Sequence, residues 1–280
     1  MKLIDLHIHT NFSDGMFSAE EAVAYAHKME LSAIAITDHD TTNGIKPAQE
    51  AAAKYNIEIV PGIELSSYLS EFLVDEIHIL GYFIEWENDK FQEKLSLLKA
   101  KRIERAKQIL KKLSHLGIKI NEERVFQLAG QSVIGRLHFA QIMVEDGYVF
   151  SIRDAFYNYL GEGRPAFVPK MYLTPQETIK MILDVKGIPV LAHPNIQQID
   201  EKVIKELVAQ GLKGIEIFCS KLDEQTAGYF QHLAKENNLL ITGGSDCHGK
   251  ILSRDILMGT IEIPYSILEE LRKAKQTLFP

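Results

Sequence analysis

Residues 2–10 of the chain read KLIDLHIHT, a short apolar stretch that ends in two histidines separated by one residue. The pattern predicts a β-strand over Lys2–Leu6. Because successive side chains of a strand point to opposite faces, His7 and His9 share one face and can bind one ion, while Leu6 and Ile8 pack inward. A His-x-His pair alone is a weak metal signal, so its meaning depends on the residues at the ends of the other strands.

Similar apolar strands recur along the chain and alternate with amphipathic helical patterns. Strands spaced by helices of this length favour an α/β fold with a parallel sheet of βα units, either a barrel or a doubly wound sheet. The strands are predicted at Lys2–Leu6, Ser32–Thr37, Ile57–Ile63, Phe72–Ile84, Ile188–Ala192, Lys213–Phe218 and Leu239–Thr242. The helices between them are expected at Ser18–Glu30, Asn43–Lys54, Pro175–Val185, Glu201–Ala209 and Asp223–Glu236.

The segment from residue 89 to residue 172 breaks this alternation. It holds a long amphipathic helix, three shorter helical stretches and a Gly-Glu-Gly-Arg-Pro run at 161–165. We therefore predict a barrel domain made of residues 1–88 and 173–280, with residues 89–172 inserted as a small, all-helical, substrate-capping domain. The helices of the insertion are expected at Phe91–Leu116, Glu122–Gln127, Arg136–Glu145 and Ile152–Tyr159.

Composition places the chain among ordinary globular proteins. Its 280 residues are 46% hydrophobic and 25% charged, which excludes the disordered, collagenous and coiled-coil classes. No apolar run approaches the ~18 residues that a membrane helix needs, and the first residues do not resemble a signal peptide. Two cysteines are too few for a disulfide framework. We therefore expect a cytoplasmic protein without membrane association.

The charge of the chain is distributed unevenly. A net charge of −7 argues against broad binding of nucleic acid through overall electrostatics. Residues 94–119 hold nine basic side chains and one acid, a net +8, so the rest of the chain carries −15. A short basic element on an acidic body disfavours long RNA, because counterion release rewards many cationic contacts.

Histidines and carboxylates follow the ends of the predicted strands. In a βα barrel the carboxyl ends of the strands meet at the one face where active sites are built. Residues far apart in the sequence are therefore expected to lie close together. They are His39 after the second strand, Glu64 at the end of the third, His193 after the fifth, and Asp246 and His248 after the last.

Asp14 and His78 complete a set of nine candidate ligands. Taken alone, Asp14 is typical of a turn and His78 of a core histidine in an apolar strand. Independent surface or core residues, however, have no reason to gather at one end of five strands. Nine ligands exceed the four of a single zinc site and suit two or three divalent ions of the Mn, Fe or Zn type. The set is His7, His9, Asp14, His39, Glu64, His78, His193, Asp246 and His248.

The order of these motifs resembles the PHP family (polymerase and histidinol phosphatase domain). A His-x-His opening is followed by Thr-Asp-His-Asp at 37–40, Gly-x-Glu at 62–64, His-Pro at 193–194 and Ser-Asp-x-His at 245–248. The resemblance covers residues 1–88 and 173–260 and implies a distorted seven-stranded βα barrel with a trinuclear site. It implies a first metal on His7, His9, Glu64 and Asp246, a second on Asp14, His39 and His248, and a third on Glu64, His78 and His193.

The helical insertion resembles that of PHP phosphoesterases that remove the 3′-phosphate of nucleoside 3′,5′-bisphosphates, some of which also trim short RNA from its 5′ end. In that subgroup an Arg-x-x-Arg and a later Gly-Arg contact the substrate. The matching residues here are Arg102 with Arg105, and Gly135 with Arg136. The two arginines of the first pair share a helix face, and guanidinium groups suit phosphate oxygens. A solvated basic face is the alternative.

We therefore expect hydrolysis of nucleotide phosphate esters, above all of pAp to AMP, by a metal-bridging hydroxide. The leaving oxygen would receive its proton from Asp40, His138 or a metal-bound water. The expected partner is a small phosphorylated nucleotide or a short RNA end, with no obligate protein partner. The rival functions are a 5′-3′ exoribonuclease, a histidinol phosphatase, an amidohydrolase, which the lack of a strand-end lysine disfavours, and a non-catalytic PHP scaffold, which the intact ligand set disfavours.

Overall fold

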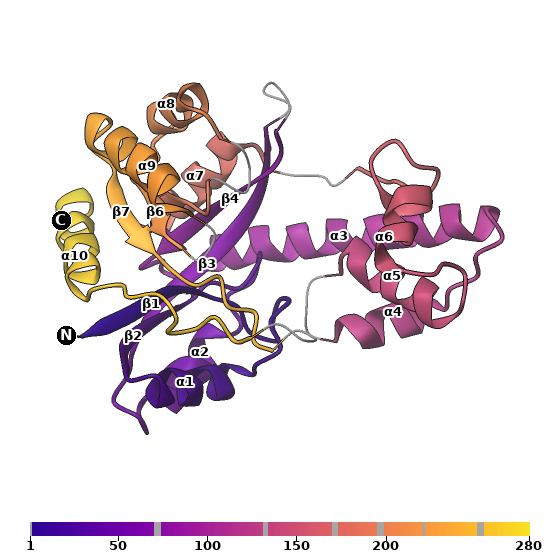
Figure 1. Ribbon diagram of the computed structural model, residues 1–280, viewed down its shortest axis with the longest axis horizontal. Coiled ribbons are helices and arrows are strands. Elements are labelled where there is room, and N and C mark those ends of the chain that lie inside the picture. The colour runs from indigo at the N-terminus through magenta and orange to yellow at the C-terminus, as the bar shows by residue number, and fades with distance from the viewer. Residues whose placement is uncertain are drawn as a thin grey trace. The chain divides into compact units, whose positions relative to one another are not determined.

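The computed structural model describes residues 2–69, 74–130, 134–169, 173–194, 199–219, 222–250 and 255–280 (Figure 1). The chain divides into two compact units. Met1–Gln92 and Tyr172–Pro280 form the first, which we call the sheet unit, and Glu93–Met171 form the second, which we call the helical unit. The predicted domain limits, between residues 88 and 89 and between residues 172 and 173, stay a prediction; residue 172 lies outside the described chain.

A seven-stranded sheet forms the centre of the sheet unit, with its strands side by side in sequence order. The strands are β1 (Leu3–Ile8), β2 (Leu31–Ile36), β3 (Glu58–Leu69), β4 (Val74–Tyr82), β5 (Ile188–Leu191), β6 (Gly214–Phe218) and β7 (Leu240–Gly243). The segment after β7 lies against β1, where the backbone N–H of His9 donates to the carbonyl oxygen of Cys247 at 3.0 Å. The sheet therefore curls, and the predicted α/β class and distorted-barrel architecture are confirmed.

The pairing of the strands differs from the predicted parallel order at β4. The first three strands are parallel and so are the last three, whereas β4 is antiparallel to both β3 and β5. Only four residues separate β3 from β4, too few for the crossover that a parallel pair requires. The start of the predicted fourth strand, Phe72 and Leu73, lies outside the described residues. β3 also continues past Ile63, so Glu64 lies inside this strand and not at its end.

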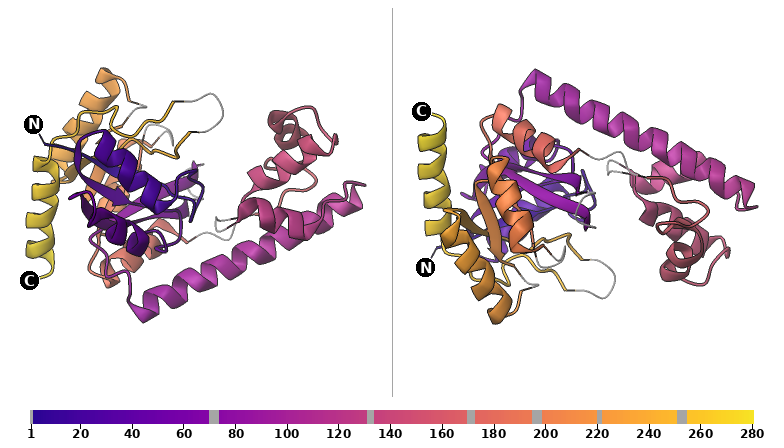
Figure 2. Two further views of the ribbon diagram at one scale, coloured as in Figure 1. Left: turned by 90° about the horizontal axis from the view of Figure 1, so that it is seen from below. Right: turned by 90° about the horizontal axis from the view of Figure 1, so that it is seen from above.

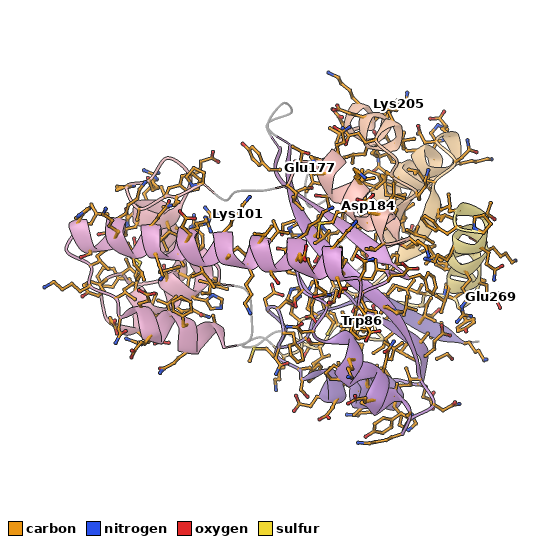
Figure 3. All side chains as sticks on the ribbon, turned by 180° about the vertical axis from the view of Figure 1, so that it is seen from behind. Trp86, Lys101, Glu177, Asp184, Lys205 and Glu269 are labelled. Atoms are coloured by element: carbon orange, nitrogen blue, oxygen red, sulfur yellow. The ribbon has the colours of Figure 1, made fainter. Side chains whose placement is uncertain are left out.

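Helices flank the sheet (Figure 2) and begin at caps that the sequence supplies. Ser18 and Glu21 form the predicted capping box of α1, in which the hydroxyl accepts from the Glu21 amide at 3.1 Å. Thr174 and Glu177 form a second capping box at the start of α7; Glu177 is labelled in Figure 3. The flanking helices are α1 (Ala19–Lys28), α2 (Ile45–Ala52), α7 (Pro175–Asp184), α8 (Glu201–Ala209), α9 (Glu224–Glu236) and α10 (Ser266–Leu278).

Helix α10 has no counterpart among the predicted helices. Its buried residues Ile267, Leu268 and Leu271 join a core cluster that includes Ile4 of β1 and Val190 of β5. Together with Ala274 these residues recur at the spacing of an amphipathic helix, so the sequence carried a signal for α10 that the prediction did not use. Its packing adds an apolar cover to the sheet.

The helical unit has a core of its own. Ile109, Leu113, Val125, Phe139 and Met143 are buried in one cluster. Within the described chain no helix combines the length and apolar character that a membrane crossing needs. The helices are α3 (Asp89–His115), most of which belongs to this unit, α4 (Glu122–Ala129), α5 (Arg136–Glu145), α6 (Ile152–Ala155) and the π-helix η2 (Phe156–Leu160).

Candidate metal centre

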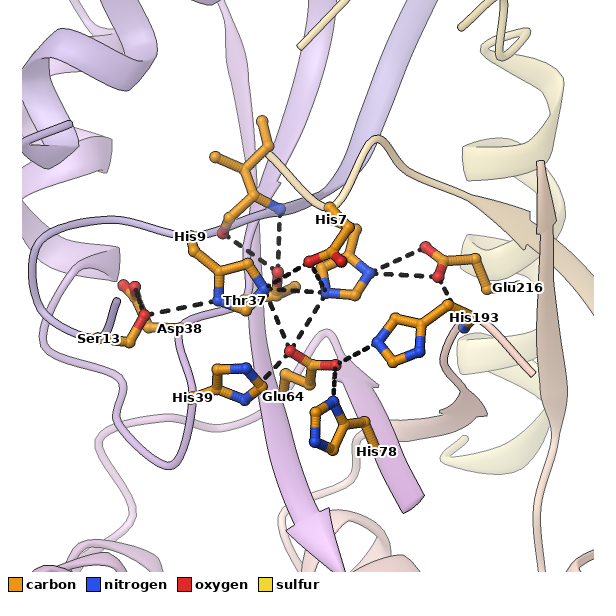
Figure 4. A network of polar contacts seen from close by, with 12 residues as sticks. His7, His9, Ser13, Thr37, Asp38, His39, Glu64, His78, His193 and Glu216 are labelled. Atoms are coloured by element: carbon orange, nitrogen blue, oxygen red, sulfur yellow. Dashed lines mark hydrogen bonds and ion pairs between the residues drawn. The ribbon is translucent and has the colours of Figure 1, made fainter. Parts of the chain in front are cut away.

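All nine side chains predicted as metal ligands lie together in the sheet unit. Figure 4 labels six of them: His7, His9, His39, Glu64, His78 and His193. They come from two kinds of position in the fold. His7 belongs to β1, Glu64 to β3 and His78 to β4, so these three are held by strand backbone on both sides. The other six follow strands: His9 and Asp14 come after β1, His39 after β2, His193 after β5, and Asp246 and His248 after β7.

Four of these side chains form a first group of potential ligand atoms. The Nε2 atoms of His7 and His9 lie 3.0 Å apart. Glu64 Oε2 lies 3.3 Å from the first of these nitrogens and 3.1 Å from the second. Asp246 Oδ1 lies 3.5 Å and 3.2 Å from the same two atoms. All four ligand atoms lie within 4.8 Å of one another, so a single ion can contact them all.

A second group surrounds Asp14. Its carboxylate Oδ2 lies 3.3 Å from His248 Nε2 and 3.8 Å from His39 Nε2, and Oδ1 lies 3.5 Å from His9 Nδ1. The rings of His9 and His248 stack with centroids 4.2 Å apart. The Asp14 side chain is 46% exposed, so this group opens to solvent while the first group is buried.

Glu64 joins a third group to the other two. Its Oε1 lies 2.9 Å from His78 Nδ1 and 3.1 Å from His193 Nε2, while its Oε2 lies 3.2 Å from His39 Nδ1. The carboxylate has no exposed surface. One buried carboxylate therefore presents each of its oxygens to a different set of histidines, the arrangement of a bridging ligand.

The hydrogen bonds around the histidines leave ring nitrogens available to a cation. His248 Nδ1 lies 2.9 Å from the carbonyl oxygen of Asp246. Since a carbonyl only accepts, Nδ1 carries the proton and Nε2 of the neutral ring presents its lone pair towards Asp14. His7 and His9 bring two Nε2 atoms together beside two carboxylates. A divalent cation satisfies such acceptors at once, so imidazole and carboxylate donors in this arrangement fit an ion of the Mn, Fe or Zn type.

In the metal-free protein the carboxylates hold a proton on His9. Burial disfavours the charge, but Asp246 and Glu64 outweigh it and raise the pKa of His9 to about 10. Burial by itself would raise the pKa of Asp246, but the nearby His7 and His9 hold this pKa well below its usual range. For His39 burial outweighs the neighbouring carboxylates and lowers the pKa to about 3. A metal that takes His9 as a ligand must therefore displace a proton.

Local backbone strain accompanies the site. Eight non-glycine residues of the described chain have positive φ, and three of them, Asp40 (52°), His193 (26°) and Asp246 (53°), belong to the predicted functional set. Such conformations persist only where the surrounding structure holds them. Gly244 allows the segment after β7 to lie against His7, because a Cβ there would lie 2.2 Å from the Cβ of that histidine.

Asp38, which the sequence did not single out as a site residue, fixes the loop that carries two ligands. Its carboxylate accepts from the amide and the hydroxyl of Thr10 at 2.7 Å each and from the hydroxyl of Ser13 at 2.6 Å. These bonds tie the turn between His9 and Asp14 to the end of β2. The position of both ligands therefore depends on a buried carboxylate that is not itself a proposed ligand.

Two more buried carboxylates were missed. Asp5 accepts from the amide of Ser245 at 2.9 Å and so ties β1 to the segment after β7. Glu216 in β6 lies 3.0 Å from His7 Nδ1 through its Oε1. Both stand inside apolar strand sequences, IDL and GIEIF. Because burying an unpaired carboxylate is costly, an acidic residue inside an apolar strand is the sequence signal that could have identified Asp5 and Glu216.

The predicted substrate residues belong to the helical unit. Arg105 Nε donates to the carbonyl oxygen of Val168 at 2.9 Å. Arg136 donates to the Leu160 carbonyl at 3.2 Å, and its guanidinium lies 5.5 Å and 5.6 Å from the ring centres of two phenylalanines. Arg102 lies on α3 and Gly135 is the N-cap of α5. Local contacts thus hold Arg105 and Arg136, and a substrate role for the four residues stays a prediction.

The two predicted proton donors lie in different units. Asp40 follows His39 in the sheet unit, is 8% exposed, and accepts from the amide of Ser66 at 3.1 Å. His138 lies in the first turn of α5, where its Nδ1 accepts from the amide of Gly135 at 3.1 Å. Both side chains are held in place, and which of them donates a proton stays a prediction.

Comparison with known proteins places this geometry in a family. The model of the PHP domain family matches residues 5–142. The chain is 32% identical over 252 residues to the 5'-3' exoribonuclease Rnm of Escherichia coli strain K12, which covers 88% of this chain and 85% of that protein. It is 30% identical over 253 residues to the 3',5'-nucleoside bisphosphate phosphatase of Chromobacterium violaceum, with 89% and 88% covered.

A solved structure of a related protein has the same fold. A Bifidobacterium adolescentis protein assigned as a metal-dependent phosphoesterase superposes with a TM-score of 0.83 at 26% identity, over 96% of this chain and 95% of that one. The predicted family and the predicted class of hydrolase are confirmed. The chain belongs to the PHP domain family and is a metal-dependent phosphoester hydrolase.

Proposed function

We propose that this enzyme removes the 3′-phosphate from nucleoside 3′,5′-bisphosphates with two or three divalent ions held by the nine clustered side chains. The observation that carries the proposal is the position of Glu64, whose two buried oxygens face separate sets of histidines. Several adjacent cations bridged by one carboxylate suit phosphate ester hydrolysis. The named phosphatase of Chromobacterium violaceum supports this substrate class.

Each of the three groups of side chains is proposed as one metal position. Bound there, divalent ions would polarise the phosphoryl group and supply a water of lowered pKa. Glu64 and the histidines orient the reacting phosphate by fixing where those charges lie. Low exposure of Glu64, His7 and His9 excludes bulk water and strengthens the electrostatics. The first position takes His7, His9, Glu64 and Asp246, the second takes Asp14, His39 and His248, and the third takes Glu64, His78 and His193.

The arginines of the helical unit would bind the second phosphate. Arg102 and Arg105 lie three residues apart on α3, hence on one helix face. Guanidinium groups bind phosphate oxygens in pairs, with charge-assisted hydrogen bonds. Arg136 at the start of α5, after Gly135, would add a third such group. In this proposal the 5′-phosphate is the group that these guanidinium groups bind.

Protonation of the leaving oxygen falls in this proposal to Asp40, to His138 or to water. Asp40 is supported by its place beside His39 and by a backbone conformation that the structure holds in the left-handed region. His138 is supported by its place one turn into the helix that Arg136 begins. To distinguish the two residues, each is replaced in turn by a neutral or shortened side chain. The rates of ester hydrolysis are then compared for substrates with good and with poor leaving groups.

A second candidate function is 5′-3′ exoribonuclease activity on short RNA. Residues 93–171 contain fourteen lysines and arginines against eight acids, a charge that suits an RNA backbone. The relative from Escherichia coli carries that name. Both candidates use the same metal chemistry, so only the substrate separates them.

Phosphate release from adenosine 3′,5′-bisphosphate tests the proposal. Metal-stripped protein reloaded with Mn²⁺ is expected to release phosphate and leave adenosine 5′-monophosphate, identified by chromatography. Release that leaves adenosine 3′-monophosphate would contradict the proposed orientation. No release from the bisphosphate, with mononucleotides released from a 5′-phosphorylated oligoribonucleotide, would favour the second candidate.

A further inference from the structure

Glu216 is a buried carboxylate that none of the proposed ligand groups includes. It lies in the middle of β6, with no exposed surface. Its Oε1 and Oε2 lie 3.0 Å and 3.3 Å from Nδ1 of His7. Its Oε2 also accepts from the backbone amide of His193 at 2.9 Å. One side chain thus contacts two of the proposed ligands, His7 and His193 (Figure 4).

The contact with His7 decides which ring nitrogen can bind a metal. An ionised carboxylate only accepts, so the Nδ1 atom that faces Glu216 carries a hydrogen. In the neutral ring the lone pair is then on Nε2, the atom that lies 3.0 Å from His9 Nε2 and 3.3 Å from Glu64 Oε2. Carboxylates that accept from a ligand histidine in this way fix its tautomer and orientation and raise its basicity.

The contact with His193 holds a strained backbone. His193 has a φ of 26° and precedes Pro194, two features that the backbone resists in combination. Its amide is anchored by Glu216, and its ring then reaches Glu64 Oε1 at 3.1 Å. The rings of His7 and His193 stack with centroids 5.6 Å apart, and Glu216 contacts both residues.

We propose that Glu216 is a positioning residue that aligns His7 and His193 together and so couples the first and third metal positions. The proposal rests on the proposed function, because it takes these histidines as ligands. The second position, formed by Asp14, His39 and His248, receives no contact from Glu216 in the described structure and serves as an internal reference.

Glutamine has the same shape as glutamate but cannot replace it here. The two groups that face Glu216, the Nδ1–H of His7 and the amide of His193, both donate. A glutamine side chain accepts with its oxygen and donates with its nitrogen. In Glu216→Gln the NH₂ group therefore faces another donor, either the Nδ1–H of His7 or the amide of His193. Either His7 changes tautomer and turns a hydrogen towards the metal, or the His193 backbone loses its anchor.

Competition between the protein and a chelator for Mn²⁺ tests this inference. Wild type is expected to retain its ions, whereas Glu216→Gln is expected to bind the ions of the first and third positions about 10- to 100-fold more weakly. The ion at the second position is expected to keep its affinity. Glu58→Gln is the matched control, because this carboxylate lies at the start of β3 and contacts Arg272 and Tyr265 instead of a proposed ligand.

Each result separates the inference from its alternatives. Equal affinities in Glu216→Gln and wild type would overturn it, and so would an equal loss at all positions, which indicates a general effect on folding. Wild-type protein that binds no Mn²⁺ would overturn the ligand assignment and the proposed function with it. Should Glu216→Gln not fold, as judged by circular dichroism, Glu216→Asp keeps the charge with a shorter reach and is expected to weaken the same positions selectively.

Discussion

Two polar clusters on the same sheet are organised in opposite ways. At the start of β3, Glu58 forms an ion pair with Arg272 and accepts from the hydroxyl of Tyr265 at 2.8 Å. Six residues further along the same strand, both oxygens of Glu64 meet histidine nitrogens of five different residues, all within 3.3 Å. The first cluster pairs an acid with a permanent cation, and the second gathers lone pairs and carboxylates that an added cation would satisfy.

The difference separates a cluster that stabilises the fold from one that binds a reagent. Removing a group from the first should change stability and leave the reaction unaltered. Removing a group from the second should change metal binding and the reaction far more than stability. The expected effects range from a large loss of activity to a small loss of stability, and each of them tests this distinction.

Loss of one carboxylate from the metal centre should have the largest effect. Asp246→Asn keeps the shape of the side chain but removes the charge beside His7 and His9, and is expected to lower kcat on the order of 10³-fold with a lower metal content. Metal analysis and phosphate release measure the two effects. Asp184→Asn, on the exposed end of α7 (Figure 3), is the control and should retain both. Full activity and metal content in Asp246→Asn would refute the ligand assignment.

The arginines of the helical unit should affect binding of one phosphate and not the chemistry. Arg105→Ala removes charge-assisted hydrogen bonds of the kind that contribute about 1.5–3 kcal/mol, so KM for the bisphosphate is expected to rise by about 10- to 100-fold. Adenosine 3′-monophosphate, which lacks the second phosphate, should be affected much less. Lys101→Ala, an exposed position on the same helix (Figure 3), is the control. An equal effect on both substrates would remove the proposed role.

Metal affinity should increase with pH. The pKa of His9 is raised to about 10 in the metal-free protein, so its ring is protonated below that pH and must lose the proton to become a ligand. Each proton released makes binding up to about tenfold tighter per pH unit as the pH rises towards 10. Calorimetry of Mn²⁺ binding in two buffers of different ionisation enthalpy counts the protons. A binding enthalpy that is the same in both buffers would contradict this expectation.

The smallest effect is expected at the other cluster. Glu58→Gln weakens a half-exposed ion pair with Arg272, so the free energy of unfolding should fall by about 1 kcal/mol or less. Urea unfolding of the metal-free protein measures this change. Phosphate release should stay at the wild-type rate, and a marked loss of activity would show that the two clusters are not independent.

Much of the fold could be predicted because local patterns carry it. Seven apolar runs mark the seven strands, and Ser18 with Glu21 marks the start of α1. The direction of β4 could not be read in this way, because an apolar run says nothing about which way its neighbour runs. α10 was missed for a different reason: Ile267, Leu271 and Ala274 do recur at helical spacing, and this signal in the sequence was not used.

The same limit applies to the candidate site: a residue can be predicted from its type and its place along a strand, but not from a contact with a distant part of the sequence. His7, Glu64 and Asp246 could be proposed from sequence because each lies in or beside a strand and each residue type is a metal ligand. For Glu216 the sequence shows only that a carboxylate stands in an apolar strand; what this carboxylate does depends on its contact with His7, 209 residues away in the sequence. Spacing on α3 indicates which face Arg102 and Arg105 share but not what that face meets, so their role stays a prediction.

Titration of metal-stripped protein with Mn²⁺ shows whether hydrolysis depends on ions held by the nine clustered side chains. Phosphate release from adenosine 3′,5′-bisphosphate and bound metal are measured on the same samples. We expect no phosphate release without metal, and a rise in release that parallels metal occupancy and levels off between two and three equivalents. Full activity in protein that retains only trace metal, or bound Mn²⁺ that restores no phosphoester hydrolysis on any of the proposed substrates, would contradict it.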